Sequence, residues 1–312
     1  MASEDKSPTV PQRLEAGFAR ADRASRGWLG VLRRTLDRFA AARGAQAAAA
    51  LSYYALFSLF PLAILLITAL SFLIDPAAAQ QLIAVVLQRI LPDAQGIQEF
   101  VFDSLSSIFA SRGQVTLISL VALLWAASGV FTNLTYNLDL AWSETGRSNP
   151  LAARLVGLLM VVVVYVGLVA LLLSSATLGM LSMLPAAVMR WLGFSGQIAQ
   201  AWSVRAIPIA FSLMIFFGLY KWGPRVRVPW NIALSGALFA TLAIQILNLG
   251  FTWYLSSGLA RYELLYGPLT TIIVLLFWFY LTVLIVLVGA HFSAAMAQRR
   301  KERNAPITPP ER

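Results

Sequence analysis

The sequence predicts an all-α fold: a polytopic membrane domain of six transmembrane helices, with amphipathic helices at its surface. The composition is 59% hydrophobic and only 12% charged, whereas soluble domains carry about 25% charged residues. A helix needs about 20 apolar residues to cross a hydrocarbon core of about 30 Å. Stretches of this kind, separated by polar connectors, occupy approximately residues 47–74, 115–139, 155–184, 206–222 with an extension upstream, 231–256 and 267–297.

The six spans and their connectors form one predicted membrane domain at residues 47–297, between a basic arm at 1–46 and a basic tail at 298–312. The first apolar run begins only after the charged arm, so we expect no cleaved signal peptide. The tail is rich in proline and charge and is expected to be disordered. Cysteine is absent, which excludes disulfides and thiolate metal sites.

The basic residues are distributed unevenly between the two sides of the predicted bundle. Six crossings place both ends of the chain on one side, and that side carries nineteen of the 24 Lys and Arg residues. The positive-inside rule assigns this side to the cytoplasm, so both termini are expected there. The net charge of +10 indicates attraction to membrane lipids with anionic headgroups at the cytoplasmic face. Nucleic acid is not an expected partner, because the basic residues are not interleaved with exposed aromatic residues.

Two segments outside the spans have helical periodicity. The segment from Trp28 to Ala42 predicts an amphipathic helix on the cytoplasmic face, because apolar residues recur at helical spacing among arginines. The connector 75–114 predicts two short helices broken near Pro92. These two helices would either contact lipid directly or pack over the bundle as a cap, and the sequence favours neither alternative. The apolar residues of the first segment are Trp28, Val31, Leu32, Thr35, Leu36 and Phe39.

Polar residues inside the spans predict either a transport path or hydrogen bonds between helices. Hydrocarbon offers no water to satisfy polar groups, so such residues face a partner or a cavity. Pro61 is expected to kink the first span, because it removes a backbone donor. The alternative for each amide is a hydrogen bond that holds two helices together. The candidates for the path are Tyr53, Tyr54, Pro61, Asn133, Asn137, Gln245 and Asn248.

A second candidate site lies at the non-cytoplasmic ends of spans four to six. It combines cations, an anion and aromatic rings, which predicts an outer-mouth site for an anion or a headgroup. The alternative is that the charged side chains snorkel to the headgroup region. The residues of this site are Arg205, Arg261, Tyr262, Glu263 and Tyr266.

Two further ionisable residues lie at the predicted spans. Asp139 is expected either to pair with Arg147 or Arg154 or to carry protons. His291 is the only histidine, and a lone histidine cannot form a histidine-rich metal site, so a hydrogen-bonded interfacial side chain is expected. The sequence has no Gly-rich phosphate loop and no clustered metal-ligand spacing. We therefore expect no catalytic residue, no cofactor, no metal and no enzymatic activity.

Two segments resemble the YihY/BrkB family of bacterial inner-membrane proteins, once labelled ribonuclease BN. Residues 47–66, AAAALSYYALFSLFPLAILL, are similar to the first-span signature of that family. Residues 261–295 are similar to its last span, with Tyr-Gly, a Trp-x-Tyr centre and a closing Gly-Ala. The resemblance implies a six-span protein of the bacterial inner (plasma) membrane with a transport or envelope role. The chain has His291 where the family usually has Glu, so a role that needs a fixed negative charge there is not implied.

The leading function on these grounds is transport or flipping of an envelope-related amphiphile or other solute through the six-helix bundle. The competing class is a non-transporting structural or adaptor protein of the cell envelope, in which the same amides hold the helices together. A ribonuclease is a remote third class. A polar-lined cavity that reaches the middle of the bilayer would favour transport, and a dry, closely packed bundle would favour the structural role. A homo-oligomer is left open.

Overall fold

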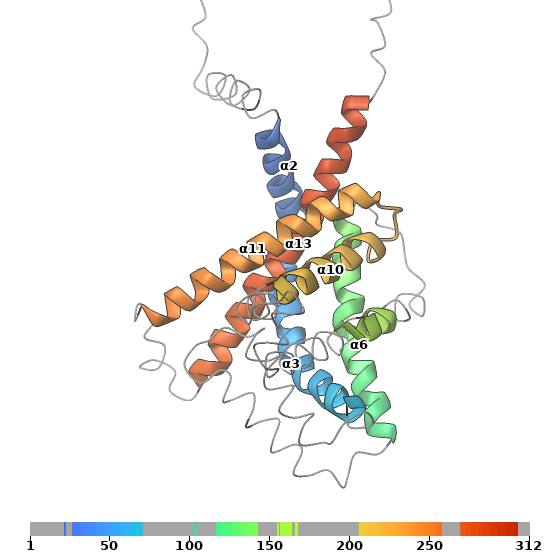
Figure 1. Ribbon diagram of the computed structural model, residues 1–312, viewed down its shortest axis with the longest axis vertical. Coiled ribbons are helices and arrows are strands. Elements are labelled where there is room, and N and C mark those ends of the chain that lie inside the picture. The colour runs from blue at the N-terminus through green and yellow to red at the C-terminus, as the bar shows by residue number, and fades with distance from the viewer. Residues whose placement is uncertain are drawn as a thin grey trace, which may run out of the picture.

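A computed structural model describes residues 22, 27–70, 103, 117–142, 155, 157–163, 166–167, 206–257 and 269–304. These residues form helices, turns and bends without a strand, so the all-α prediction is confirmed for this part of the chain. The helices are α2 (Trp28–Ala41), α3 (Gly44–Leu70), α6 (Leu117–Ala141), α10 (Ile207–Trp222), α11 (Trp230–Ser256) and α13 (Thr270–Asn304) (Figure 1).

The long helices coincide with predicted spans. By length and composition, α11 and α13 are able to cross a membrane, and α10 is a shorter apolar helix. The first and second predicted spans correspond to α3 and α6, which contain 27 and 25 residues. The third predicted span is described only at residues 155, 157–163 and 166–167, and the connector 75–114 only at Asp103. The count of six spans therefore stays a prediction.

The last helix is longer than the apolar pattern indicates. The predicted span ends at residue 297, whereas α13 continues to Asn304 and includes the first residues of the predicted tail. Hydropathy marks the part of a helix that suits hydrocarbon, but the charged residues that follow are also good helix formers. The extension is held by α2, because Arg34 forms an ion pair with Glu302 at 2.7 Å. The Trp28 end of α2 and the Asn304 end of α13 lie at the same end of the molecule (Figure 1).

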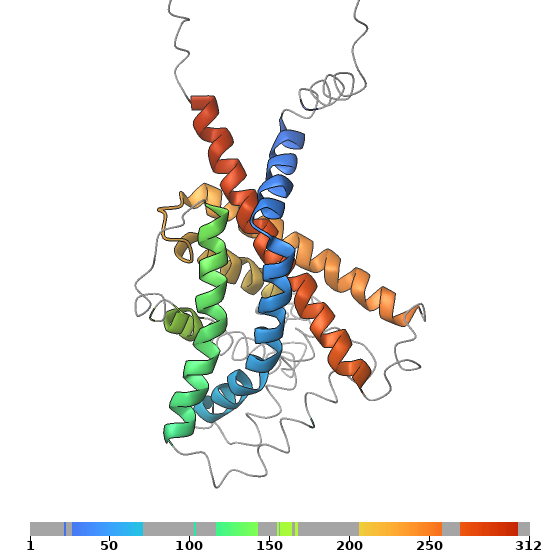
Figure 2. The same ribbon diagram turned by 180° about the vertical axis from the view of Figure 1, so that it is seen from behind.

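The helix α3 bends in its second half (Figures 1 and 2). Pro61 lies within this helix, which continues without a break to Leu70. A proline in a helix interior removes one backbone hydrogen bond, and its ring displaces the carbonyl one turn earlier. The bend lies in the half of the helix that contains Pro61, where the sequence predicts a kink.

The amphipathic helix α2 crosses α13. Trp28, at the first turn of α2, stacks on Phe292 with ring centroids 6.3 Å apart, and Phe39 lies edge-on to His291 at 5.8 Å. Trp28 and Phe39 are about 17 Å apart along the axis of α2 at 1.5 Å per residue, yet both reach neighbouring residues of α13. Arg34 of α2 also pairs with Glu302, so α2 packs against α13 from His291 to Glu302. Val31 and Thr35 are buried in this crossing.

Small residues allow α10, α11 and α13 to pack closely. A Cβ atom on Gly236 of α11 would collide with the hydroxyl of Ser293, and one on Gly289 of α13 would collide with the hydroxyl of Tyr220. That tyrosine hydroxyl donates a buried hydrogen bond of 2.8 Å to the carbonyl of Val286. Small residues at a crossing let helix backbones approach in a membrane protein, where van der Waals packing replaces the hydrophobic effect.

Candidate functional site

The outer surface of α11 carries a continuous apolar stripe. Its members recur every three or four residues, so they share one face of the helix. The first and last members are tryptophans about 35 Å apart along the axis, which is close to the thickness of a hydrocarbon core, and tryptophan is enriched at both membrane interfaces. The members of this α11 stripe, all exposed, are Trp230, Leu234, Leu238, Leu242, Ile246, Leu249 and Trp253.

The opposite face of α11 is buried against the rest of the bundle. It carries mainly small or branched residues, among them Ala233, Ala237 and Ala240, which are fully buried. The helix is therefore apolar on both faces, but the faces differ in the size of their side chains. The small residues pack against α10 and α13. The leucines and the isoleucine of the α11 stripe are exposed, whereas Trp230 at its start also packs against Phe217 and Trp222 of α10.

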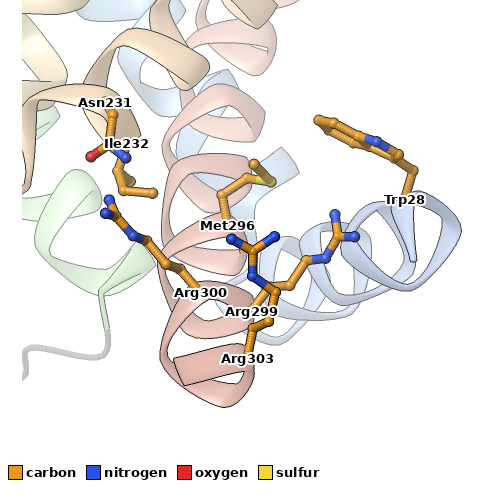
Figure 3. A pocket seen from close by; sticks show the side chains of 7 residues that line it. All are labelled: Trp28, Asn231, Ile232, Met296, Arg299, Arg300 and Arg303. Atoms are coloured by element: carbon orange, nitrogen blue, oxygen red, sulfur yellow. The ribbon is translucent and has the colours of Figure 1, made fainter. Parts of the chain in front are cut away.

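A pocket opens at the first turn of α11, next to the start of the stripe. It has a volume of about 700 Å³ and lies between the beginnings of α2 and α11 and the last turns of α13 (Figure 3). We call it the arginine pocket. Its lining residues are Trp28, Asn231, Ile232, Met296, Arg299, Arg300 and Arg303.

The lining of the arginine pocket is cationic. Three arginines line it, and its seven lining residues include no Asp or Glu. The guanidinium of Arg299 lies 5.6 Å from the centre of the Trp28 ring, whereas Arg300 extends toward Asn231 on the other side of the pocket (Figure 3). In the described part of the chain, neither Arg300 nor Arg303 forms an ion pair.

The acidic residue nearest in sequence, Glu302, is engaged by α2 instead. Arg34 donates a hydrogen bond of 2.7 Å to one carboxylate oxygen of Glu302, and Gln298 donates one of 3.1 Å to the other. The hydrogen bond from Arg34 lowers the pKa of Glu302 below its ordinary range. Glu302 therefore stays ionised, and it neutralises Arg34 on α2.

A second charged contact joins α6 to the short connector between α10 and α11. The buried carboxylate of Asp139 lies 3.2 Å from Nε of Arg225 and accepts a hydrogen bond of 2.9 Å from the backbone N–H of the same residue. The predicted pairing partners of Asp139, Arg147 or Arg154, lie outside the described residues, and the alternative role in carrying protons stays a prediction. The structure supplies Arg225, which belongs to another cytoplasmic connector of the predicted topology. That shared side was the signal that could have identified it.

The family follows from comparison with known proteins. A model of the virulence factor BrkB family matches residues 35–312. The chain belongs to the BrkB family. The curated relatives include an UPF0761 membrane protein of Photobacterium profundum, 27% identical over 82% of this chain and 77% of the relative. Another UPF0761 membrane protein, from Methylibium petroleiphilum, is 28% identical over 94% of this chain and 70% of the relative. This BrkB-family chain is accordingly a membrane protein.

A third BrkB relative carries a different kind of name. It is a ribonuclease-like protein, YfkH, of Bacillus subtilis, 26% identical over 88% of this chain and 97% of the relative. No solved structure matches the chain.

The tyrosines of the predicted path lie on the surface of this BrkB-family protein. Tyr53 and Tyr54 are both exposed on α3. Their rings meet edge-on with centroids 6.0 Å apart, and Tyr53 also contacts Phe57 at 4.6 Å. Pro61 follows on the same helix.

The amides of the predicted path make different kinds of hydrogen bond. Asn133 and Asn137, on α6, donate to backbone carbonyls one turn earlier in their own helix, at 2.9 and 2.8 Å. Asn248 on α11 instead accepts a hydrogen bond of 3.2 Å from Nε1 of Trp278 on α13. Gln245 is half-buried on α11. The structure therefore brings Gln245 and Asn248 to one helix and makes Asn248 an interhelical contact.

The predicted outer-mouth site lies outside the described residues. This holds for all five of its members, Arg205, Arg261, Tyr262, Glu263 and Tyr266.

His291 is buried where α2 crosses α13. Its ring meets Phe39 edge-on, and its Nδ1 has no hydrogen-bond partner within the described part of the chain. The expected hydrogen bond is therefore not found at this nitrogen.

Proposed function

We propose that this protein transports or flips an envelope-related amphiphile, or another solute, across the bacterial inner membrane. The observation that carries the proposal is the α11 stripe, which begins beside the arginine pocket. Asn231 lines the pocket, and the first leucine of the stripe, Leu234, follows one helical turn later. A polar site and an apolar track on one helix suit a substrate that has a polar head and apolar tails.

The physical demand on such a protein is the passage of the polar head. Moving a polar group into hydrocarbon without a hydrogen-bond partner costs roughly 2–7 kcal/mol, whereas the tails remain in an apolar environment throughout. Gln245 and Asn248 lie on one flank of the α11 stripe, in its second half. We propose that these amides form hydrogen bonds with the polar head while the apolar tails move along the stripe. The remaining path residues would contact the head elsewhere on its way across the membrane.

The proposed membrane arrangement has six spans and both termini in the cytoplasm. It is supported by the excess of basic residues on one side and by the common end at which α2 begins and α13 finishes (Figure 2). Reporter fusions placed within residues 75–114 and at the C-terminus should report opposite sides of the membrane. Reports from the same side would overturn the six-span arrangement.

A structural or adaptor role is the second candidate, and the α11–α13 contact favours it. Gly236 and Gly289 leave no room for a side chain at the crossing, and the hydrogen bond from Trp278 to the amide of Asn248 ties the same two helices. In a protein of this class the polar residues of the spans hold helices together and nothing passes them.

Lipid translocation by the purified protein separates these two classes. The full chain is reconstituted into vesicles that contain fluorescent phospholipids, and a membrane-impermeant reductant is added to bleach the outer leaflet. A transporter should bring inner-leaflet lipid to the reductant faster than protein-free vesicles do. Gln245→Leu should slow this exchange, whereas the neighbouring Ile246→Leu should not. Equal rates with and without protein, for anionic and zwitterionic lipids alike, would favour the structural role.

We also propose that the chain is not an enzyme, in spite of the name of the Bacillus relative. No group of three or more His, Cys, Asp or Glu side chains able to hold a metal lies within the described residues, and the sequence has no clustered metal-ligand spacing. Labelled RNA incubated with the purified protein should remain intact. Cleavage that copurifies with the protein through several columns would contradict this proposal.

A further inference from the structure

We propose that the arginine pocket binds a phosphate group that carries net negative charge. The group is either the head of a phospholipid-like amphiphile or a soluble phosphate ester. The inference deepens the proposed function by naming the chemistry of the substrate head, and it rests on that function for the link to transport. The binding itself is testable without any transport.

The first support is the spacing of the arginines on α13. Arg299 and Arg303 are four residues apart, and Arg300 and Arg303 are three apart, so the three side chains share one side of the helix. Like charges at these spacings repel and destabilise a helix. The favourable interaction of cations with a helix C-terminus offsets part of this repulsion. A bound anion would remove the rest, and the three guanidinium groups are the donors best suited to phosphate oxygens.

The second support comes from α11. The first turn of this helix faces the same pocket through Asn231 and Ile232. The N-cap position is Pro229, and no side chain caps the first turn. The positive end of the helix dipole therefore lies next to the arginines, and it adds to their attraction for an anion. Two independent elements thus attract an anion to one place.

The size and the remaining lining favour a phosphate ester over a small anion such as carboxylate. A volume of about 700 Å³ exceeds what a carboxylate alone would fill, and it falls within the range of small-molecule sites. Trp28, Ile232 and Met296 give the pocket apolar walls on either side of the arginines. They would contact the carbon atoms attached to the phosphate, and the adjacent α11 stripe would continue that contact for acyl chains.

The test measures binding to the full chain in nanodiscs of zwitterionic phosphatidylcholine, by calorimetry at physiological ionic strength. The probes are inorganic phosphate, glycerol 3-phosphate, dihexanoyl phosphatidic acid and, as the zwitterionic control, dihexanoyl phosphatidylcholine. Arg300→Gln and Arg303→Gln should each weaken binding of dihexanoyl phosphatidic acid by about tenfold, as expected for loss of one charge-assisted hydrogen bond. Arg300→Lys should be intermediate, because it keeps the charge without the planar fork.

Lys301→Gln is the matched control. It removes the same charge from the same exposed turn of α13, but Lys301 does not line the pocket, so the change should weaken binding by no more than about twofold at this ionic strength. All variants replace exposed residues, and circular dichroism confirms that each is folded. Equal weakening by Lys301→Gln and Arg300→Gln would show general surface attraction and overturn the proposal.

The probes distinguish the source of the phosphate. Tighter binding of dihexanoyl phosphatidic acid than of glycerol 3-phosphate identifies a lipid head, and equal binding identifies a soluble ester; either supports the site. Binding of no anionic probe by the unchanged protein would overturn it. Lipid exchange without binding of any anionic probe would contradict the phosphate site and would leave the proposed transport function intact. Binding without lipid exchange would contradict transport and would leave the phosphate site intact.

Discussion

The two ends of the contact between α11 and α13 differ in almost every respect. At the crossing, Gly236 and Gly289 leave no space for even a methyl group. A few residues further along both helices, the same pair has separated enough to enclose the arginine pocket of about 700 Å³. Helices that cross at an angle move apart with distance from the crossing, although on the side away from the pocket a hydrogen bond between Asn248 and Trp278 still joins them. Close approach at one point and an open site beside it are therefore one geometric feature.

The crossing and the pocket therefore have different roles: the first contributes to stability and the second to binding. The crossing contributes packing, and a substitution there acts on the whole bundle. The pocket contributes exposed charge, and a substitution there acts on what the bundle binds. α13 serves both purposes because its composition changes along its length, from apolar residues to QRRKERN. If these roles are separate, substitutions at contacts between helices should change stability and should leave binding at the pocket unchanged.

The largest expected effect is at the crossing. Gly236→Leu forces a side chain into the space of Ser293 and Gly289, and overpacking of this kind costs about 1–3 kcal/mol or more. Thermal unfolding in detergent should show a clear fall in Tm. Gly250→Leu is the control on the same helix, because a Cβ there meets no atom within 4 Å. If both variants unfold at the same temperature, the crossing is looser than described.

The next effect is at the ion pair between α6 and the α10–α11 connector. Asp139→Asn removes the charge that the partly exposed Arg225 faces, and breaking such a pair should cost about 1–3 kcal/mol. The backbone N–H of Arg225 can still donate to the amide oxygen, which limits the loss. Denaturation in mixed micelles measures it, and Arg225→Gln should cost less because its side chain is 42% exposed. A variant of unchanged stability would show that the contact is incidental.

A smaller effect is expected at Asn248 and Trp278. Interhelical hydrogen bonds in membrane proteins contribute about 0.6 kcal/mol on average. A double-mutant cycle of Asn248→Ala and Trp278→Phe should give a coupling free energy of unfolding near that value. A coupling free energy of zero would show that the hydrogen bond between Asn248 and Trp278 does not stabilise the fold, and would support a role for Asn248 in the transport path instead.

The smallest effect concerns the ion pair between α2 and α13. The pKa of Glu302 is lowered in the folded protein, so its contribution is present above the ordinary Glu range, about pH 4.3, and is lost as the pH falls through the lowered pKa. Because the pair is exposed, the contribution is about 0–1 kcal/mol. Unfolding measured as a function of pH, with Glu302→Gln as reference, should isolate it. A pH dependence that is the same in both proteins would contradict the assignment.

Much of the fold was available from local pattern. The downstream limit of α10 and both limits of α11 agree with the predicted spans within one residue, because a helix that suits hydrocarbon must be apolar over a fixed length. The predicted upstream extension of the fourth span lies outside the described residues. The amphipathic helix begins at Trp28 as predicted, since its periodicity is local too. The predicted last span ends at residue 297, whereas α13 continues to Asn304, because hydropathy does not detect a helix that continues into water.

The class of protein and the helical segments were predictable from the sequence, because composition and periodicity act over one or two turns of chain, and two segments were enough to indicate the family. The arginines that follow the last span are also visible there. The folded structure was needed to find that Arg300 lies across a pocket from Asn231, and that Arg225 is the partner of Asp139. Such contacts depend on the angle at which distant helices cross, and that angle is set by where small residues such as Gly236 and Gly289 meet.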